Sequence, residues 1–350
     1  MKVFHQNLRF WLIILACFSL AMIKPFILCS FCDPVTADVT LPHIVLSKAT
    51  SKQSTLWLVT CETNVTNPFF RQWNESAHYF REKHELSSRN RIKIRNVCTG
   101  ESWLGFMTKI VSMEAFVKDI LVASSESDLD EQIVLFSDSD SFFNSFAVDL
   151  EMVLRRFDEA RNGCPLLVSA EPNCYINKAC DETDLKYLYP GATRASNCPQ
   201  FVNSGQYMGS LTAMEHMLRG LMNMKNEDQP EEVHKNDQYR MAVFRAENPR
   251  LICLDKESSI FRSMSFGFVD RSKKGCKTCG TDAIASCGEF SFPFEGKLNM
   301  TTGIVELPPI PGCSGETFPF AIHYPGPTKN FESSSHMTNS IAKIKERLAI

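Results

Sequence analysis

Two aspartates one residue apart are the side chains of this sequence best suited to chemistry. Asp138 and Asp140 follow the apolar residues 133–136, with Ser137 between the apolar run and the first aspartate. An apolar run of this length that ends in a polar turn predicts a buried parallel strand, and ligands bind beyond the carboxyl ends of such strands. Carboxylates placed there suit Mg²⁺ or Mn²⁺ held jointly by the protein and a diphosphate. The alternative interpretation is a solvated turn of Asp and Ser residues.

Polar side chains also stand close to glycine in residues 203–209, Asn-Ser-Gly-Gln-Tyr-Met-Gly. Because glycine allows a backbone to approach a ligand closely or to turn unusually, this string is either part of a site or a glycine-containing loop. Further along the chain, Asn236 and Asp237 begin an apolar segment, where either of them suits the N-cap of a helix.

One histidine near the end of the chain has suitable neighbours for a metal site. His323 follows the apolar residues 318–322 and precedes Gly326 and Lys329. An imidazole is a common metal ligand, and a glycine and a lysine beside it suit a phosphate. The sequence therefore predicts either a metal-ligating histidine next to a phosphate site or an isolated histidine in the core.

The elements that must position these residues follow from the spacing of apolar side chains. Continuous or alternating apolar runs predict strands at 55–60, 92–97, 133–137 and 165–170, and helical spacing predicts helices at 68–86, 107–123 and 149–160. This β-α-β-α-β-α-β order predicts an α/β, Rossmann-like fold with a mainly parallel central sheet and helices on both faces. The second half is less regular, with helices expected at 211–223 and 340–348.

Composition and charge are those of an ordinary globular protein. The chain has 350 residues, of which 44% are hydrophobic and 22% are charged, as in an ordinary globular protein. Its formal net charge of −3 favours neither nucleic acid nor an anionic membrane surface as a partner.

The amino-terminal residues predict entry into the secretory pathway. Lys2 and Arg9 precede an apolar stretch at 11–23, whose length is typical of a signal peptide. Counted through Lys24, the stretch reaches the length of a membrane-spanning signal anchor. We expect residues 1–37 to be that signal peptide or anchor, 38–53 a stem, and 54–350 a single domain in the ER or Golgi lumen. Membrane contact is expected only through the amino-terminal segment.

Cysteines and glycosylation sequons agree with a lumenal location. Of the 14 cysteines, 11 lie beyond the leader, and sequons begin at Asn64, Asn74 and Asn299. Cys276, Cys279 and Cys287 have spacing that a zinc site also uses, but disulfides are the favoured interpretation in a secreted chain.

Seven strings stand in a fixed order over about residues 55–330. They are Thr-Cys-Glu-Thr (60–63), Asp-Ser-Asp-Ser (138–141), Leu-Leu-Val-Ser-Ala-Glu (166–171), Val-Asn-Ser-Gly-Gln-Tyr-Met-Gly (202–209), Asn-Asp-Gln (236–238), Leu-Asp-Lys-Glu-Ser-Ser-Ile-Phe (254–261) and His-Tyr-Pro-Gly-Pro-Thr-Lys (323–329). In this order they resemble motifs of the glycosyltransferase domain of the lysyl hydroxylase (procollagen glycosyltransferase) family. The resemblance implies a GT-A fold, a UDP-sugar donor, and Mn²⁺, or Mg²⁺ in its place, as the cofactor.

The resemblance also implies roles by position. Asp138 and His323 are expected to ligate the metal, together with Asp140. Thr60, Lys109 and Ser139 are expected to contact the nucleotide. Gly326 and Lys329 are expected beside the diphosphate, and Asn203 and Asp237 are expected to face the sugar or the acceptor. In an inverting reaction Asp237 is the candidate base for the acceptor hydroxyl, whereas a retaining reaction needs no such base.

The sequence departs from the family pattern in the metal motif. The second aspartate of the family motif falls at Ser141, and its tyrosine falls at Asp140. Either Asp140 takes over as the second ligand or metal binding is weakened. Residues 174–199 carry extra cysteines on the expected acceptor side, and no iron-dependent hydroxylase domain is expected within the chain.

These observations lead to one expectation of function and one alternative. The expected activity moves a hexose, galactose or glucose, from a UDP-sugar to a hydroxyl on a protein or glycan, with hydroxylysine of collagen-like chains as the family's acceptor. The alternative is a catalytically inactive GT-A scaffold that binds a nucleotide, a glycan or a partner in the lumen.

Overall fold

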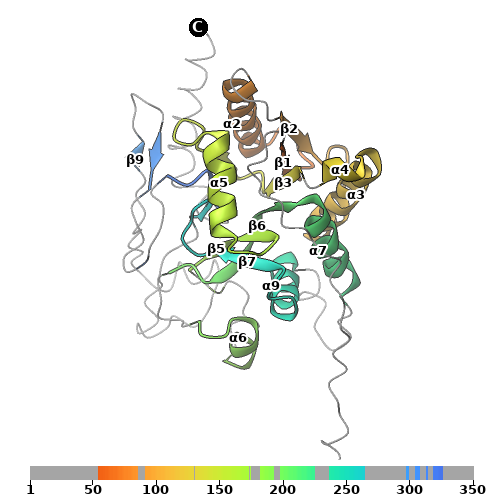
Figure 1. Ribbon diagram of the computed structural model, residues 1–350, viewed down its shortest axis with the longest axis vertical. Coiled ribbons are helices and arrows are strands. Elements are labelled where there is room, and N and C mark those ends of the chain that lie inside the picture. Colours follow the sequence, from red (N-terminus) through yellow and green to blue (C-terminus); the bar gives the residue numbers. More distant parts are fainter. Residues whose placement is uncertain are drawn as a thin grey trace, which may run out of the picture. The chain divides into compact units, whose positions relative to one another are not determined.

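A six-stranded sheet forms the centre of the protein (Figure 1). The computed structural model describes residues 54–85, 91–129, 131–172, 174, 182–192, 198–224, 236–264, 297–298, 304–307, 313 and 318–325. The strands of the sheet, in the order in which they lie, are β2 (Arg91–Asn96), β1 (Thr55–Thr60), β3 (Gln132–Ser137), β6 (Phe201–Ser210), β5 (Leu166–Glu171) and β7 (Ile252–Asp255).

Most of the pairings in this sheet are parallel. Strand β1 pairs in parallel with β2 and β3, and β5 pairs in parallel with β7. Only β6 runs antiparallel, to β3 on one side and to β5 on the other. The prediction of an α/β fold with a mainly parallel sheet is confirmed.

Helices cover both faces of the sheet. On one face, α2 (Pro68–Glu85) and α5 (Leu150–Ala160) share a buried apolar core with the strands, which includes Leu58 of β1 and Leu135 of β3. On the other face, α3 (Met107–Ala123) packs against α7 (Leu211–Asn223), and α7 packs against β3 and β6. The ring of Trp57, which alternates with Leu58 along β1, meets Phe116 of α3 edge to face at 5.3 Å.

Three further helices complete the described helical structure. They are α4 (Glu126–Leu129), α6 (Glu182–Leu188) and α9 (Asp237–Glu247). Helix α9 packs against β6 and α7. The side chain of Asn236 caps α9 by accepting a hydrogen bond from the backbone N–H of Tyr239 at 3.0 Å, so the N-cap is the first of the two residues that the sequence offered.

A second sheet brings the distant histidine to the aspartates. It has three strands in the order β4 (Ser141–Phe143), β11 (Ala321–His323) and β8 (Phe261–Ser263). Strand β11 is antiparallel to β4, and in this register His323 lies opposite Ser141. A separate antiparallel pair consists of β9 (Lys297–Leu298) and β10 (Val305–Glu306).

Strand β6 corrects one interpretation of the sequence. Residues 203–209 lie inside this ten-residue strand and are buried, so the interpretation of this string as a glycine-containing loop was wrong. Glycine is required here by packing rather than by turning, since a Cβ on Gly209 would lie 2.3 Å from the Leu166 side chain and 2.9 Å from the Pro165 carbonyl oxygen.

Disulfides join distant parts of the chain. Within the described residues they are Cys61–Cys98, Cys164–Cys253 and Cys198–Cys313, and Cys174 is also disulfide-bonded. The expected signal or anchor, the stem, the Cys276–Cys279–Cys287 group and the helix expected at 340–348 lie outside the described residues. Within the described ranges, no helix combines the length and the apolar character needed to cross a membrane.

Candidate metal and nucleotide site

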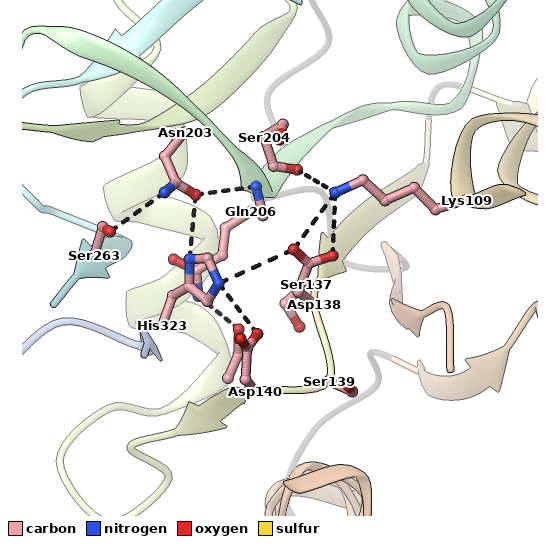
Figure 2. Close-up of polar contacts among 12 residues, drawn as sticks. Lys109, Ser137, Asp138, Ser139, Asp140, Asn203, Ser204, Gln206, Ser263 and His323 are labelled. Atoms are coloured by element: carbon pink, nitrogen blue, oxygen red, sulfur yellow. Dashed lines mark hydrogen bonds and ion pairs between the residues drawn. The ribbon is translucent and has the colours of Figure 1, made fainter. Parts of the chain in front are cut away.

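Three potential metal ligands converge at the carboxyl end of β3 (Figure 2). One ligand atom from each of Asp138, Asp140 and His323 lies within 4.8 Å of the other two. The imidazole Nε2 is 3.1 Å from a carboxylate oxygen of Asp140 and 4.0 Å from one of Asp138. The aspartates come from the turn after β3 and the histidine comes from β11, so the convergence depends on the pairing of β11 with β4.

Burial distinguishes the two aspartates. The side chains of Asp140 and His323 are buried, whereas that of Asp138 is 31% exposed. Both aspartates line a pocket of about 260 Å³, and Asp138 is the more exposed of the two. The walls of the pocket also include residues that follow β1, residues that precede α3, and two polar side chains: Cys61, Glu62, Thr63, Trp103, Phe106, Lys109 and Ser139.

The charges at this place fit a divalent cation. Partial burial raises the pKa of Asp138, the neighbouring carboxylates of Asp140 and Asp237 raise it further, and Lys109 and His323 act in the opposite direction. A bound cation would relieve the repulsion between the carboxylates. Two carboxylates and one imidazole are ligands that Mn²⁺ accepts, and they leave coordination positions for oxygens of a substrate.

Lys109 joins the metal motif to the start of α9. Its buried ammonium group is 3.3 Å from a carboxylate oxygen of Asp138 and 2.5 Å from one of Asp237. Burial lowers the pKa of Lys109, but the two carboxylates raise it by more, so that the pKa lies above its usual value. The lysine is therefore cationic, and it lines the pocket where the resemblance placed a nucleotide ligand.

The two residues expected at the sugar or acceptor are both buried. The carboxylate of Asp237 faces Lys109, so its expected role as a base stays a prediction. The side chain of Asn203, which is 3% exposed, lies beside the imidazole of His323. Neither Asn203 nor Asp237 lines the pocket.

The residues expected at the nucleotide and diphosphate have different outcomes. Ser139 lines the pocket, and its hydroxyl donates a hydrogen bond of 2.7 Å to Glu62. Thr60 is fully buried at the end of β1, and its hydroxyl has no hydrogen-bond partner among the described residues. Gly326 and Lys329 lie outside the described residues.

Sequence reasoning assigned no role to five residues that line the pocket, among them Glu62, Trp103 and Phe106. Glu62 lies two residues past the end of β1, so the rule that drew attention to Asp138, a carboxylate past the carboxyl end of a strand, also applies to Glu62. Trp103 and Phe106 are half-exposed and pack edge to face at 6.0 Å. Their signal is the presence of two aromatic residues among the four that precede α3.

A comparison with protein families decides the relationship of this chain. A family model described as the PLOD GT domain matches residues 52–275, which is more than half of the chain. This chain belongs to that procollagen glycosyltransferase family. The family resemblance is thereby confirmed. The matched region contains β1 to β8, both aspartates of the metal motif and six of the seven strings, whereas the string at 323–329 lies beyond it.

Two solved structures that match this chain at low similarity are described as glycosyltransferases. One is a glycosyltransferase involved in glycosylation of the major capsid of PBCV-1, with 10% identity and a TM-score of 0.38, over 81% of this chain and 99% of that one. Another is mouse xyloside xylosyltransferase 1 in its apo form, with 11% identity and a TM-score of 0.42, over 79% of this chain and 99% of that one. None of the curated proteins compared with this chain matches it.

Proposed function

We propose that this family member is an active, metal-dependent glycosyltransferase that moves galactose or glucose from a UDP-sugar to a hydroxyl group. Hydroxylysine in collagen-like chains is the acceptor class that its family suggests. The observation that carries the proposal is the convergence of Asp138, Asp140 and His323 beside a pocket. Carboxylates held this close to each other repel, and a bound cation would relieve that repulsion.

The residues of the site have separable tasks. Asp138, Asp140 and His323 would hold Mn²⁺ or a similar ion, which when bound supplies Lewis-acid stabilisation of the negative charge on a departing diphosphate. Lys109 adds a fixed positive charge 3.3 Å from Asp138. Trp103 and Phe106 give one side of the pocket an apolar wall, which suits a ring rather than a second charged group.

Location in the secretory pathway belongs to the same proposal. It is supported by the disulfides, which persist in oxidising compartments, and by the exposed sequon at Asn64. A full-length chain produced in eukaryotic cells should therefore lose apparent mass on enzymatic removal of N-linked glycans. A chain whose mass is unchanged by this treatment would contradict a lumenal location.

A donor screen tests the activity directly. The full chain is incubated with UDP-galactose or UDP-glucose, Mn²⁺ and a collagen-like peptide that contains hydroxylysine, with EDTA as the matched condition. We expect UDP release with one donor, dependent on Mn²⁺, and a loss of about 10²–10³ in rate in Asp138→Ala.

The exposed Asp119 on α3 provides a matched control, and Asp119→Asn should keep the wild-type rate. Absence of UDP release with both donors would favour the inactive scaffold. Equal rates in the wild type and in Asp138→Ala would contradict the metal site.

A further inference from the structure

The imidazole of His323 is held from two sides, apart from its approach to the aspartates. Its Nδ1 lies 3.2 Å from the side-chain oxygen of Asn203 (Figure 2). The backbone of Gly205 lies against the ring, because a Cβ added there would be 2.3 Å from Cε1 and less than 3 Å from both ring nitrogens. The ring is therefore confined between β6 and the turn after β3, with Nε2 directed at Asp140.

The contact with Asn203 determines which ring nitrogen carries a proton. A side-chain amide oxygen can only accept a hydrogen bond, so Nδ1 of His323 must be the donor. A neutral ring protonated at Nδ1 presents the lone pair of Nε2 to the aspartates, and this is the form that a cation needs.

The orientation of the Asn203 amide is fixed by its other partners. Its oxygen also accepts the backbone N–H of Gly205 at 3.0 Å. Its nitrogen donates to a carboxylate oxygen of Glu171 at 3.2 Å and to the hydroxyl of Ser263 at 3.3 Å. A flipped amide would direct its N–H groups at the Gly205 N–H, so the observed orientation is the stable one.

Glu171 is held in turn by Gln238. The side-chain nitrogen of Gln238, on α9, donates to the second carboxylate oxygen of Glu171 at 2.6 Å. The hydrogen bonds thus run from α9 through the end of β5 and through β6 to the imidazole on β11. All four hydrogen-bonding positions of the Asn203 side chain are engaged within the protein, which leaves none for a sugar hydroxyl.

We propose that Asn203 is a positioning residue for the metal ligand His323, and that Glu171 fixes the Asn203 amide in the orientation this requires. This replaces the expectation that Asn203 faces the sugar or acceptor. The inference rests on the proposed function, because it assigns to His323 the binding of a divalent cation. Asn203 acts on the cation only through the imidazole.

The test measures the affinity of the full chain for Mn²⁺ alone, by electron paramagnetic resonance of the free ion and without UDP-sugar. Asn203→Ala should weaken Mn²⁺ binding about 10- to 100-fold, as loss of a hydrogen-bond partner of a metal-ligating histidine does. Ser263→Ala is the matched control. It removes one contact of the Asn203 nitrogen but leaves both contacts of the oxygen, and should bind Mn²⁺ nearly as the wild type does.

A paired exchange tests the direction of the hydrogen bonds. Asn203→Asp alone places a second carboxylate against Glu171 and should weaken Mn²⁺ binding. Adding Glu171→Gln restores the hydrogen bond in the reverse direction, because the amide nitrogen at position 171 now donates to the carboxylate at position 203. N203D/E171Q should therefore bind Mn²⁺ more tightly than N203D. A merely structural role of Asn203 predicts a recovery of stability but no recovery of the Mn²⁺ affinity of the folded chain. The comparison also remains decisive if Asn203→Ala fails to fold.

The outcomes separate the inference from the proposed function. If the wild type binds Mn²⁺ and Asn203→Ala binds it equally well, the inference is overturned and the proposed function stands. The inference is also overturned if N203D/E171Q binds no better than N203D. If the wild type itself binds no Mn²⁺, the metal-dependent function fails, and the positioning role fails with it.

Discussion

Asp138, Asp140, Lys109 and His323 meet at the carboxyl end of β3, and their arrangement bears on the altered metal motif. Asp140 is buried and faces His323 at 3.1 Å. Ser141, which stands where the family has its second aspartate, is fully buried and accepts a long hydrogen bond of 3.4 Å from Gln206. The geometry therefore favours the alternative in which Asp140 supplies the second carboxylate.

This view gives opposite expectations for two adjacent residues. Asp140→Asn removes a charge beside His323 and should lower the rate of transfer by about 10²–10³, with a parallel loss of Mn²⁺ affinity. Ser141→Ala removes only a hydroxyl with one long hydrogen bond, and should keep both properties close to the wild type. Steady-state transfer assays and Mn²⁺ titrations check both. A severe loss in Ser141→Ala with little change in Asp140→Asn would reverse the assignment.

Lys109 is predicted to matter for stability as well as for charge. Lys109→Met leaves the buried carboxylate of Asp237 without its ion-pair partner, which should cost about 3–5 kcal/mol in the free energy of unfolding. The double variant K109M/D237N should recover much of this loss, because it removes both charges. Denaturant unfolding of the two single variants and the double variant measures the coupling. Purely additive effects would show that the pair is not coupled.

The ion pair also has a defined dependence on pH. The pKa of Lys109 is raised in the folded protein because Asp138 and Asp237 outweigh the effect of burial. A raised pKa of a base adds stability that is complete below the pKa of the unfolded chain, about 10.4, and is lost as the pH rises through the folded value. Lys109 should therefore make no contribution to any change in stability between pH 6 and pH 9.

At the scale of elements, the periodic segments were predictable, whereas strand β6, which lies against the imidazole of His323, was not. The helix expected at 107–123 coincides with α3, and the strand expected at 55–60 coincides with β1. Strand β6 was missed because its polar residues do not alternate with apolar ones. Asn203 and Gln206 are buried there because they hydrogen-bond to His323 and Ser141 respectively, and single-sequence patterns cannot anticipate such partners.

Gly209, near the end of β6, tests how tightly β6 packs against β5 in the central sheet. Gly209→Ala places a methyl group against the backbone oxygen of Pro165 and the side chain of Leu166, and overpacking of this kind should cost about 1–3 kcal/mol in stability. Leu104→Ala, at a side chain that is 82% exposed, is the control and should change stability by less than about 0.5 kcal/mol. Thermal and denaturant unfolding measure both. An unchanged stability in Gly209→Ala would mean that β5 shifts to accommodate the added methyl group without a loss in free energy.

At the scale of the molecule, the site joins residues that are far apart in the sequence. The ligands come from the turn after β3 and from β11, and Asn203 on β6 lies between them. The order of motifs along the chain predicted which residues belong together. It could not predict how they meet, because the short strands β4 and β11 have no sequence signal of their own and their register fixes the geometry.

Because the site needs both β3 and β11, ligand binding should stabilise the fold as a whole. A ligand that binds only the folded state adds about 2.7 kcal/mol at a free concentration of 100 times its dissociation constant. We expect Mn²⁺ and UDP together to raise the unfolding midpoint of the full chain, and to raise it by more than either alone, since a diphosphate would complete the coordination left open by three protein ligands. In Asp140→Asn this increment should be largely lost, while Asp119→Asn should retain it. An increment of wild-type size in Asp140→Asn would place the binding of Mn²⁺ and UDP elsewhere in the protein.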